Sequence, residues 1–236
     1  MKLPKEISPN PIVISTVEVR YKSEISSQKL FPIVYNLFRE VLPEFEQISL
    51  PVELKESNPN LKYNPDYVLS NEKYKLSFSD CVISFENQNS YQLWTNYSKF
   101  ITESINKFFS INHINFIDRI GVRYASVLDK TEDVNQVLNF NPSINSDIYK
   151  QNFEHFSTKL SIGEISLFLQ VYQNAQSTKI GNKISGVYVD IDASQIGEFK
   201  PDNQILDIIN NLHLEEKKLF FSLLKPEFLK SLNPIY

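Results

Sequence analysis

The chain has 236 residues and a net charge of −4, and 42% of its residues are hydrophobic and 22% charged. This length allows one large domain or two closely packed lobes, and the composition supplies a core of normal size, so disorder is expected only at the ends. Without a block of Lys and Arg, the acidic balance argues against non-specific nucleic-acid binding and leaves only a local basic patch as a route to it.

Features that would indicate secretion or a membrane are missing from the sequence. The single cysteine, Cys81, rules out a disulfide within the chain. The N-terminal residues lack the apolar core of a signal peptide, and no apolar run approaches the ~18 residues of a membrane span. We therefore expect a cytoplasmic protein without a membrane segment.

The first half of the chain predicts several strands and two helices. Residues 1–11 contain three prolines and form an extended lead-in, and residues 12–22 alternate apolar and polar side chains as a half-buried strand does. Apolar residues recur at helical spacing over 30–42 and 90–110. The other strands are expected at 46–54, 66–70, 73–79, 81–85 and 114–128.

The second half begins with a polar stretch of weak periodicity, residues 129–152, which is the predicted linker. A long strand over 156–173 follows, and its apolar residues change parity at Gly163 and Glu164, which requires a bulge or a turn there. The elements expected after it are a turn at 177–183, a strand at 187–191 and a helix at 202–224 with Asp202 as its N-cap.

This order predicts an α+β fold with a large, mostly antiparallel sheet and two or three helices packed mainly on one face. The predicted organisation is a lead-in at 1–11, an N-terminal lobe at 12–128, the linker at 129–152 and a C-terminal lobe at 153–236. The two lobes share a similar layout without a sequence repeat, and we expect them to form one compact unit.

Several short segments carry a family resemblance. They are P-I-V at 11–13, V-E-V-R-Y at 17–21, R-I-G-V-R-Y at 119–124, V-D-I-D at 189–192, L-H at 212–213 and F-F at 220–221. Together they resemble a sporadically distributed family of uncharacterised bacterial proteins of about this length, whose best marker is a strand of the form R-I-G-x-R-Y. The resemblance spans nearly the whole chain, brings no activity with it, and implies an accessory, defence-linked setting.

Arg119, Gly121 and Arg123 alternate along one predicted strand and share one face. The two arginines would lie roughly 13 Å apart, with a shallow notch at the glycine. Guanidinium groups suit carboxylate or phosphate, so these residues are a candidate site for an anion or an acidic peptide. The alternative is internal pairing, for example with Glu18, which shares a polar strand face with Arg20, and a glycine that makes room for a packed helix.

Asp190 and Asp192 share the polar face of a later strand, about 6.6 Å apart along it. Two carboxylates at this distance are candidates for holding a divalent cation or for acid–base catalysis, with His213 as a general base. The alternative is a solvated strand face or pairing with Lys or Arg. The histidines and Cys81 lack metal-ligand spacing, so we predict no metal and no cofactor.

Two further candidates are aromatic. Phe109 lies at the end of the helix predicted at 90–110, and the adjacent Phe220 and Phe221 are not expected to face one core together. Phe109 and Phe221 are therefore candidate anchors for a partner, and the alternative is that they complete the core.

Three function hypotheses follow from these residues. The first is a non-enzymatic binding protein that works with a protein partner or as a homo-oligomer, and it is favoured because Gly-rich phosphate loops and catalytic motifs are missing from the sequence. The second is a hydrolase or metal-dependent enzyme that uses Asp190, Asp192 and His213. The third is an RNA- or nucleotide-binding module that uses Arg119, Arg123 and aromatic residues on the sheet.

Overall fold

The computed structural model describes the whole chain except residues 1, 49, 130–132, 140–153 and 180–181. Its strands are β1 (Ile12–Ser23), β2 (Glu44–Gln47), β3 (Tyr67–Ser70), β4 (Tyr74–Phe78), β5 (Val82–Asn87), β6 (Ile114–Asp129), β7 (His155–Ile162), β8 (Ile165–Lys179) and β9 (Asn182–Phe199). Its helices are α1 (Ser27–Phe38), α2 (Val52–Ser57), the 3-10 turn η1 (Pro59–Leu61), α3 (Leu93–Phe109), α4 (Val134–Val137), α5 (Gln204–Leu223) and α6 (Pro226–Ser231).

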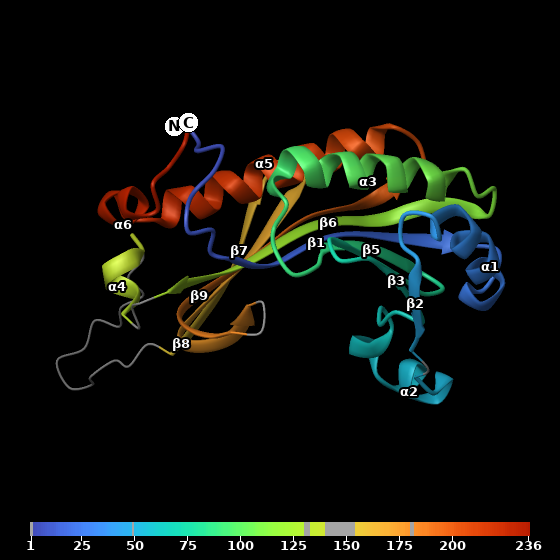
Figure 1. Ribbon diagram of the computed structural model, residues 1–236. Helices are drawn as coiled ribbons and strands as arrows, with labels where there is room; N and C mark the ends of the chain where they lie inside the picture. The colour runs from blue at the N-terminus through green and yellow to red at the C-terminus, as the bar shows by residue number, and fades with distance from the viewer. Residues whose placement is uncertain (1, 49, 130–132, 140–153, 180–181) are drawn as a thin grey trace. The chain divides into compact units, whose positions relative to one another are not determined.

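The strands form one nine-stranded antiparallel sheet in the order β2-β3-β4-β5-β1-β6-β9-β8-β7, on which α3 and α5 pack. Figure 1 shows these elements along the chain. The predicted α+β class with a large antiparallel sheet is therefore confirmed. Strands β3 to β5 and β7 to β9 follow one another through short connections, because antiparallel strands need only a tight turn between them. The central strands β1 and β6 instead pair with strands that are distant in the sequence.

The strand predicted at 46–54 is wrong over most of its length. β2 ends at Gln47, and α2 begins at Val52 directly after Pro51. Proline has no N–H to donate to a sheet ladder, but its fixed φ suits the start of a helix, so the chain changes from strand to helix at this point.

Helix α1 begins at Ser27, earlier than the predicted start at residue 30. The backbone N–H of Ser27 donates to the carboxylate of Asp80 at 2.5 Å, and its hydroxyl donates to Asp66 at 2.8 Å. Asp80 thus satisfies a backbone N–H that the first helical turn leaves without an intrahelical partner, and Asp66 holds the Ser27 side chain. The cap therefore comes from residues far along the chain, which the helical periodicity could not reveal.

The phase change at Gly163 and Glu164 is a turn that divides the predicted strand into β7 and β8. Ile162 pairs with Ile165, so the loop has two residues, and Gly163 has a φ of 55°. A two-residue hairpin with a left-handed glycine in its first position matches the right-handed twist of the flanking strands. β7 and β8 then pair in continuous register from this turn to His155 and Tyr172.

The chain forms two compact units, each assembled from separate stretches of sequence. The first unit contains residues 1–15, 123–193 and 211–236, and the second contains residues 16–122 and 194–210. β1, β6, β9 and α5 each contribute residues to both units. The predicted lobes, in contrast, are continuous stretches, and most of the linker predicted at 129–152 lies outside the described residues.

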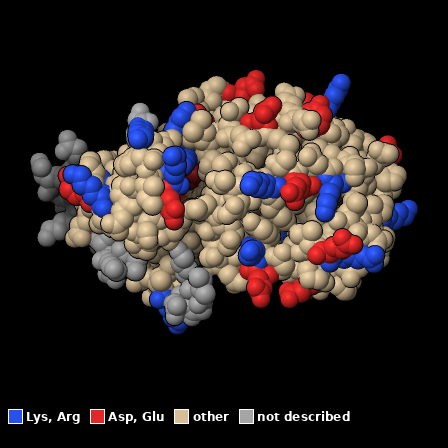
Figure 2. All heavy atoms as spheres, turned by 45° about the horizontal axis from the view of Figure 1, so that its top comes forward, with Lys and Arg blue, Asp and Glu red and all other residues tan. Residues whose placement is uncertain are grey.

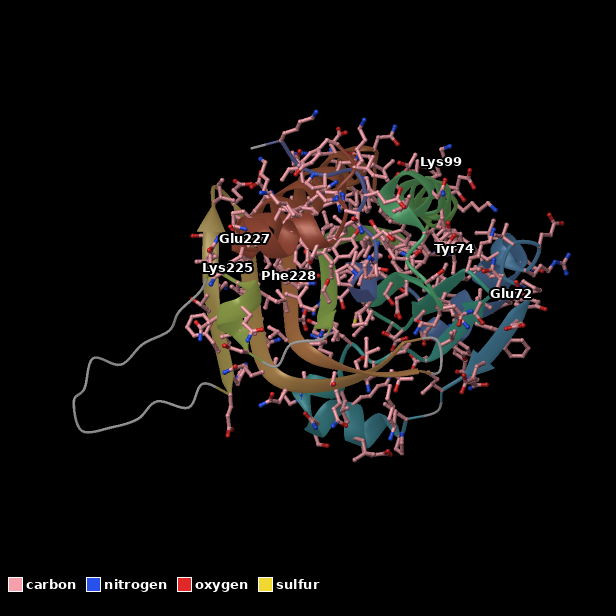
Figure 3. All side chains as sticks on the ribbon, turned by 60° about the vertical axis from the view of Figure 1, so that its left-hand side comes forward. Glu72, Tyr74, Lys99, Lys225, Glu227 and Phe228 are labelled. Carbon is pink, nitrogen blue, oxygen red and sulfur yellow. The ribbon has the colours of Figure 1, made fainter. Side chains whose placement is uncertain are left out.

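In the second unit, α3 buries one stripe against the strands. The buried residues of this stripe are Tyr97, Phe100, Ile101, Ser104, Ile105 and Phe108. The Tyr97 hydroxyl donates to the carbonyl of Phe85 at 2.5 Å, so its polar group is satisfied inside the core. Tyr74 of β4 stacks on Phe100 with ring centroids 4.1 Å apart, and Figure 3 shows it close to the helix that carries Lys99.

In the first unit, the C-terminal end of α5 is held by the end of α4 and the residues just after it. Asn139 donates its backbone N–H to Leu223, and Lys225 donates its own to Val137. Lys225 lies where α5 passes into α6, near Glu227 and Phe228 (Figure 3). The two chain ends also pair, because the N–H of Ile235 donates to the carbonyl of Glu6 at 2.9 Å.

The turn between β7 and β8 supplies a stability prediction. A Cβ at position 163 would contact nothing within 4 Å, so Gly163→Ala tests the backbone conformation alone. We expect Gly163→Ala to lower the free energy of unfolding by about 1–2 kcal/mol, and Gly163→Asn by less, because asparagine tolerates positive φ better. Equilibrium urea unfolding measures both. Equal stability of Gly163→Ala and the wild type would contradict the assignment.

Candidate functional site

The candidate site lies on β9 and its neighbours in the first unit. Val187, Val189 and Ile191 are buried and point to one face of β9. Tyr188 and Asp190 alternate with them and therefore point to the other face. The ring of Tyr124 on β6 contacts His213 of α5, with centroids 5.6 Å apart. Since Arg123 precedes Tyr124 on its strand, Arg123 points away from α5.

Arg123 and Asp190 form a bidentate ion pair between β6 and β9. Nε of Arg123 donates to one carboxylate oxygen at 2.9 Å, and Nη2 donates to the other at 2.6 Å. Asp190 is only 3% exposed, whereas 46% of the Arg123 side chain is accessible. The hydrogen bond to Asp190 raises the pKa of Arg123 above its usual value against the opposing effect of burial, so the guanidinium is always charged.

Three aromatic rings continue this pair across the neighbouring strands. The Tyr188 hydroxyl lies 3.5 Å from Asp190, and its ring meets that of Tyr172 on β8 edge to face at 5.9 Å. Tyr172 in turn stacks on His155 of β7 at 4.1 Å. Burial raises the pKa of Tyr188, and the charge of Asp190 raises it further. The hydroxyl is therefore neutral and serves as a hydrogen-bond donor.

We call Arg123, Tyr188, Tyr172 and His155 the aromatic–arginine surface. These residues come from β6, β9, β8 and β7, which are consecutive strands of the sheet (Figure 1). Each ring is half-buried or exposed, so the surface can be reached from solvent. Neighbouring contacts hold the side chains in place, which lowers the entropy that a ligand would have to remove.

The other predicted arginine, Arg119, belongs to a separate cluster in the second unit. Its Nη1 donates to Glu18 at 2.7 Å, and Nε of Arg20 donates to the same oxygen at 2.8 Å. The guanidinium of Arg20 lies 3.6 Å from the centroid of the Tyr63 ring. Glu18 thus joins two arginines, as the internal-pairing alternative predicted.

The explanation predicted for Gly121 needs a correction. A Cβ at this position would overlap the guanidinium of Arg119, so the glycine makes room for the side chain of Arg119 rather than for a packed helix. The notch expected between the two arginines is filled by Arg119 itself. An anion site shared by Arg119 and Arg123 is therefore not supported by the structure.

The residues of the hydrolase hypothesis lie on two faces of the strands. Asp190 is held by Arg123 on one face, while His213 contacts Tyr124 on the other. Burial lowers the pKa of His213 from 6.5 to about 3, which makes it a poor proton acceptor at neutral pH. Asp192 is half-buried on the face of Asp190. Within the described part of the chain, no three metal-ligating side chains come together.

The aromatic candidates differ in their exposure. Phe109 is half-buried beside Phe108 at the end of α3. Phe220 and Phe221 are each only 8% exposed, which corrects the expectation that one of them would stay outside the core. The segment at 137–139 hydrogen-bonds to the end of α5, so this segment as well as the sheet contacts the end of the helix. Burial raises the pKa of the Cys81 thiol, which makes it a weak nucleophile.

Four residues of interest were not predicted from the sequence. His155, Tyr172 and Tyr188 are three of them. The alternation of apolar and polar residues along their strands indicates the face to which each ring points, but it does not show that the rings contact one another. Glu216 lies midway between Leu212 and Phe220 on the buried stripe of α5 and is 5% exposed. A carboxylate that interrupts an apolar helical stripe is a signal that the sequence does contain.

Further observations concern the charge on one face, membrane-spanning helices and similarity to known proteins. On the face drawn in Figure 2, basic and acidic side chains are interspersed. No helix among the described residues has the length and apolarity to cross a membrane. No protein-family model matches the chain, and no curated protein matches it.

The Arg123–Asp190 pair supplies a second stability prediction. Arg123→Ala leaves the buried Asp190 carboxylate without its partner, and we expect a loss of roughly 2–4 kcal/mol in the free energy of unfolding. Arg123→Lys should lose less, because it keeps the charge but not the bidentate geometry. Urea unfolding at neutral pH measures these losses. Lys230→Ala, an exposed change on α6 in the same unit, is the control, and an Arg123→Ala loss no larger than this control would contradict the role of the pair.

Glu216 supplies a prediction of pH dependence. Burial raises the pKa of its carboxyl well above the usual 4.5, so the unfolded chain releases this proton at a lower pH than the folded protein does. Stability from Glu216 is therefore present below pH 4.5 and declines as the pH rises. Glu216→Gln removes this effect, so its stability relative to the wild type should increase with pH.

Unfolding by urea at pH 5 and pH 8, on the order of three pH units apart, tests this expectation. Glu227→Gln serves as the matched control, because it makes the same chemical change at an exposed residue of α6. If the difference in free energy of unfolding between Glu216→Gln and the wild type is the same at both pH values, the carboxyl is ionised in the folded protein and the expectation is wrong.

Proposed function

We propose that this chain is a non-enzymatic binding protein that recognises a protein partner through the aromatic–arginine surface. The observation that carries the proposal is the continuous series of contacts from Arg123 through Asp190, Tyr188 and Tyr172 to His155. Tyrosine and arginine are enriched among the residues that dominate the binding energy of protein interfaces. The accessory, defence-linked setting that the family resemblance implies is consistent with such a role and forms part of the proposal.

The electrostatics of the surface favour a protein over a phosphate backbone. Asp190 neutralises Arg123 through both of its oxygens, so the guanidinium brings little net positive charge to the surface. Its half-exposed edge still offers hydrogen-bond donors, and the tyrosines offer apolar rings with polar ends. A protein surface that combines hydrogen-bond acceptors with apolar side chains can contact all of these groups, whereas nucleic acid requires a cluster of unneutralised basic side chains.

The two other hypotheses have less support. For the enzyme, Asp190 and His213 point to different faces, and Asp190 already has a basic partner. For the RNA-binding module, rings on an open sheet face are a geometry that can stack bases, but Arg119 and Arg123 are each paired with a carboxylate. The net charge of −4 also opposes it.

The proposal predicts that Tyr172 contributes strongly to partner binding. With tagged protein expressed in the native host, Tyr172→Ala should recover much less of the partner than the wild type does. We expect the affinity to fall roughly 30-fold, which corresponds to the loss of about 2 kcal/mol of binding free energy. Quantitative mass spectrometry of the co-purified proteins measures the loss. The partner so identified is then titrated against the purified variants.

Tyr236→Ala is the matched control, because Tyr236 is an exposed tyrosine on another part of the first unit. This variant should recover the partner as the wild type does. Circular dichroism must show that Tyr172→Ala remains folded. If every protein recovered with the wild type is also recovered with folded Tyr172→Ala in equal amounts, the aromatic–arginine surface is not the binding site.

A further inference from the structure

β7 is the last strand of the sheet and presents an open edge. Its eight residues pair with β8 in regular register, and the opposite side of β7 has no partner among the strands that the structure describes. Proteins usually blunt such edges with proline, bulges, charges or short strands. The other end of the sheet follows this rule, because β2 has four residues and two of them are glutamates. β7 contains one lysine and no proline.

The hairpin geometry fixes which backbone groups of β7 face outward. The N–H of Gln173 donates to the carbonyl of Glu154 at 3.0 Å, so Glu154 directs its backbone toward β8. Hydrogen-bonding direction alternates along a strand. The even-numbered residues of β7 therefore bond to β8, and the odd-numbered ones, from His155 to Ser161, direct their N–H and C=O groups toward the open edge.

Apolar surface accompanies this edge on the side of α5. Leu160 is 41% exposed and Ile162 is 53% exposed, although both lie on the same face as the buried Leu167 and Leu169 of β8. A hollow of about 400 Å³ adjoins Ile162 and is lined mainly by apolar side chains from Leu3, Leu167 and Leu219. The described residues therefore cover the apolar side chains of β7 only in part on the side of α5.

We infer that a second copy of this chain completes the edge, with the two β7 strands antiparallel about a twofold axis at Thr158. In this arrangement Thr158 lies opposite the partner's Thr158, Ser157 opposite the partner's Lys159, and Phe156 opposite the partner's Leu160. The exposed leucine thereby gains an aromatic neighbour on the side of α5. Paired threonines and paired apolar side chains are both favourable across antiparallel strands.

The register follows from symmetry and charge. A twofold axis perpendicular to the sheet pairs residues of the same face only, so it must pass beside one residue of β7. The axis at Thr158 gives every outward-facing residue of β7 an outward-facing partner. An axis at Ser157 leaves the outward groups of Ser161 unpaired, and an axis at Lys159 leaves those of His155 unpaired. The axis at Lys159 also sets two lysines directly opposite each other, which is destabilising.

The dimer would extend the proposed function without depending on it. Rotation about this axis keeps each face of the sheet on its own side, so the two aromatic–arginine surfaces would lie on the same face of the joined sheet. Two binding surfaces on one side increase the avidity for a partner that carries two matching sites. The inference itself rests only on β7.

Disulfide cross-linking tests the register. With Cys81 replaced by Ser, Thr158→Cys places two cysteines at a non-hydrogen-bonded pair, where the Cα atoms are about 4.5 Å apart, within the range of roughly 4.4–6.8 Å that disulfides span. We expect this variant to form a covalent dimer under mild oxidation on non-reducing gels. Ser157→Cys and Lys159→Cys in the same background are the matched controls, and they should form little covalent dimer.

Blocking the edge tests the assembly itself. Wild-type protein should have twice the 27.5 kDa chain mass in light scattering after gel filtration. Ser157→Pro should return it to one chain mass, because it removes an outward N–H that β8 does not use, whereas Ser157→Ala should remain dimeric.

The outcomes separate the inference from its alternatives. A cross-link at Thr158 supports it even if Ser157→Pro fails to fold. A cross-link at Ser157 or Lys159 instead overturns the register. A wild type with one chain mass at every concentration, together with no cross-link at Thr158, overturns the dimer. Unchanged partner recovery with folded Tyr172→Ala, together with a Thr158 cross-link, contradicts the proposed function and leaves the dimer standing. Loss of recovery in Tyr172→Ala, together with one chain mass and no cross-link, contradicts the dimer and leaves the proposed function standing.

Discussion

Asp190 is a carboxylate on a strand whose neighbouring residues are buried and apolar, and it can remain inside the protein because Arg123 binds both of its oxygens. An unpaired charge at 3% exposure would carry a large desolvation penalty. The pair therefore ties β6 to β9 and fixes the position of the guanidinium. Because Tyr188 and then Tyr172 and His155 pack in sequence beside this pair, the geometry of the whole aromatic–arginine surface depends on it.

The same chemistry recurs in the second unit, where Glu18 joins Arg20 and Arg119. In both places an arginine that resembles an anion-binding group in the sequence has a carboxylate partner in the folded protein. Such pairs hold strands in register, and 46% of the Arg123 side chain still faces solvent. An arginine that is paired with a carboxylate can therefore support the fold and offer hydrogen-bond donors for recognition at the same time.

The first unit carries two surfaces for which we propose different roles. The aromatic–arginine surface lies on the face turned away from α5, where polar and aromatic groups are held ready for contact. The edge at β7 offers backbone groups that no other described strand pairs with, together with the exposed Leu160 and Ile162. The first surface suits recognition of another protein, and the second suits a copy of the chain, because its pattern is complementary to itself about Thr158. His155 lies on both, so the two proposals concern adjacent parts of one structure.

The sequence by itself determined the fold class, most strands, the two long helices and the faces to which Arg123 and Asp190 point. These features depend on periodicity, which is a local property of the chain. The tertiary structure decided which residues meet: Arg123 with Asp190, Arg119 with Glu18, Ser27 with Asp80, and the burial of Glu216 and Phe221. Alternation fixes the face of a side chain but not its neighbour across the sheet, because a strand shifted by two residues keeps the same pattern with different partners.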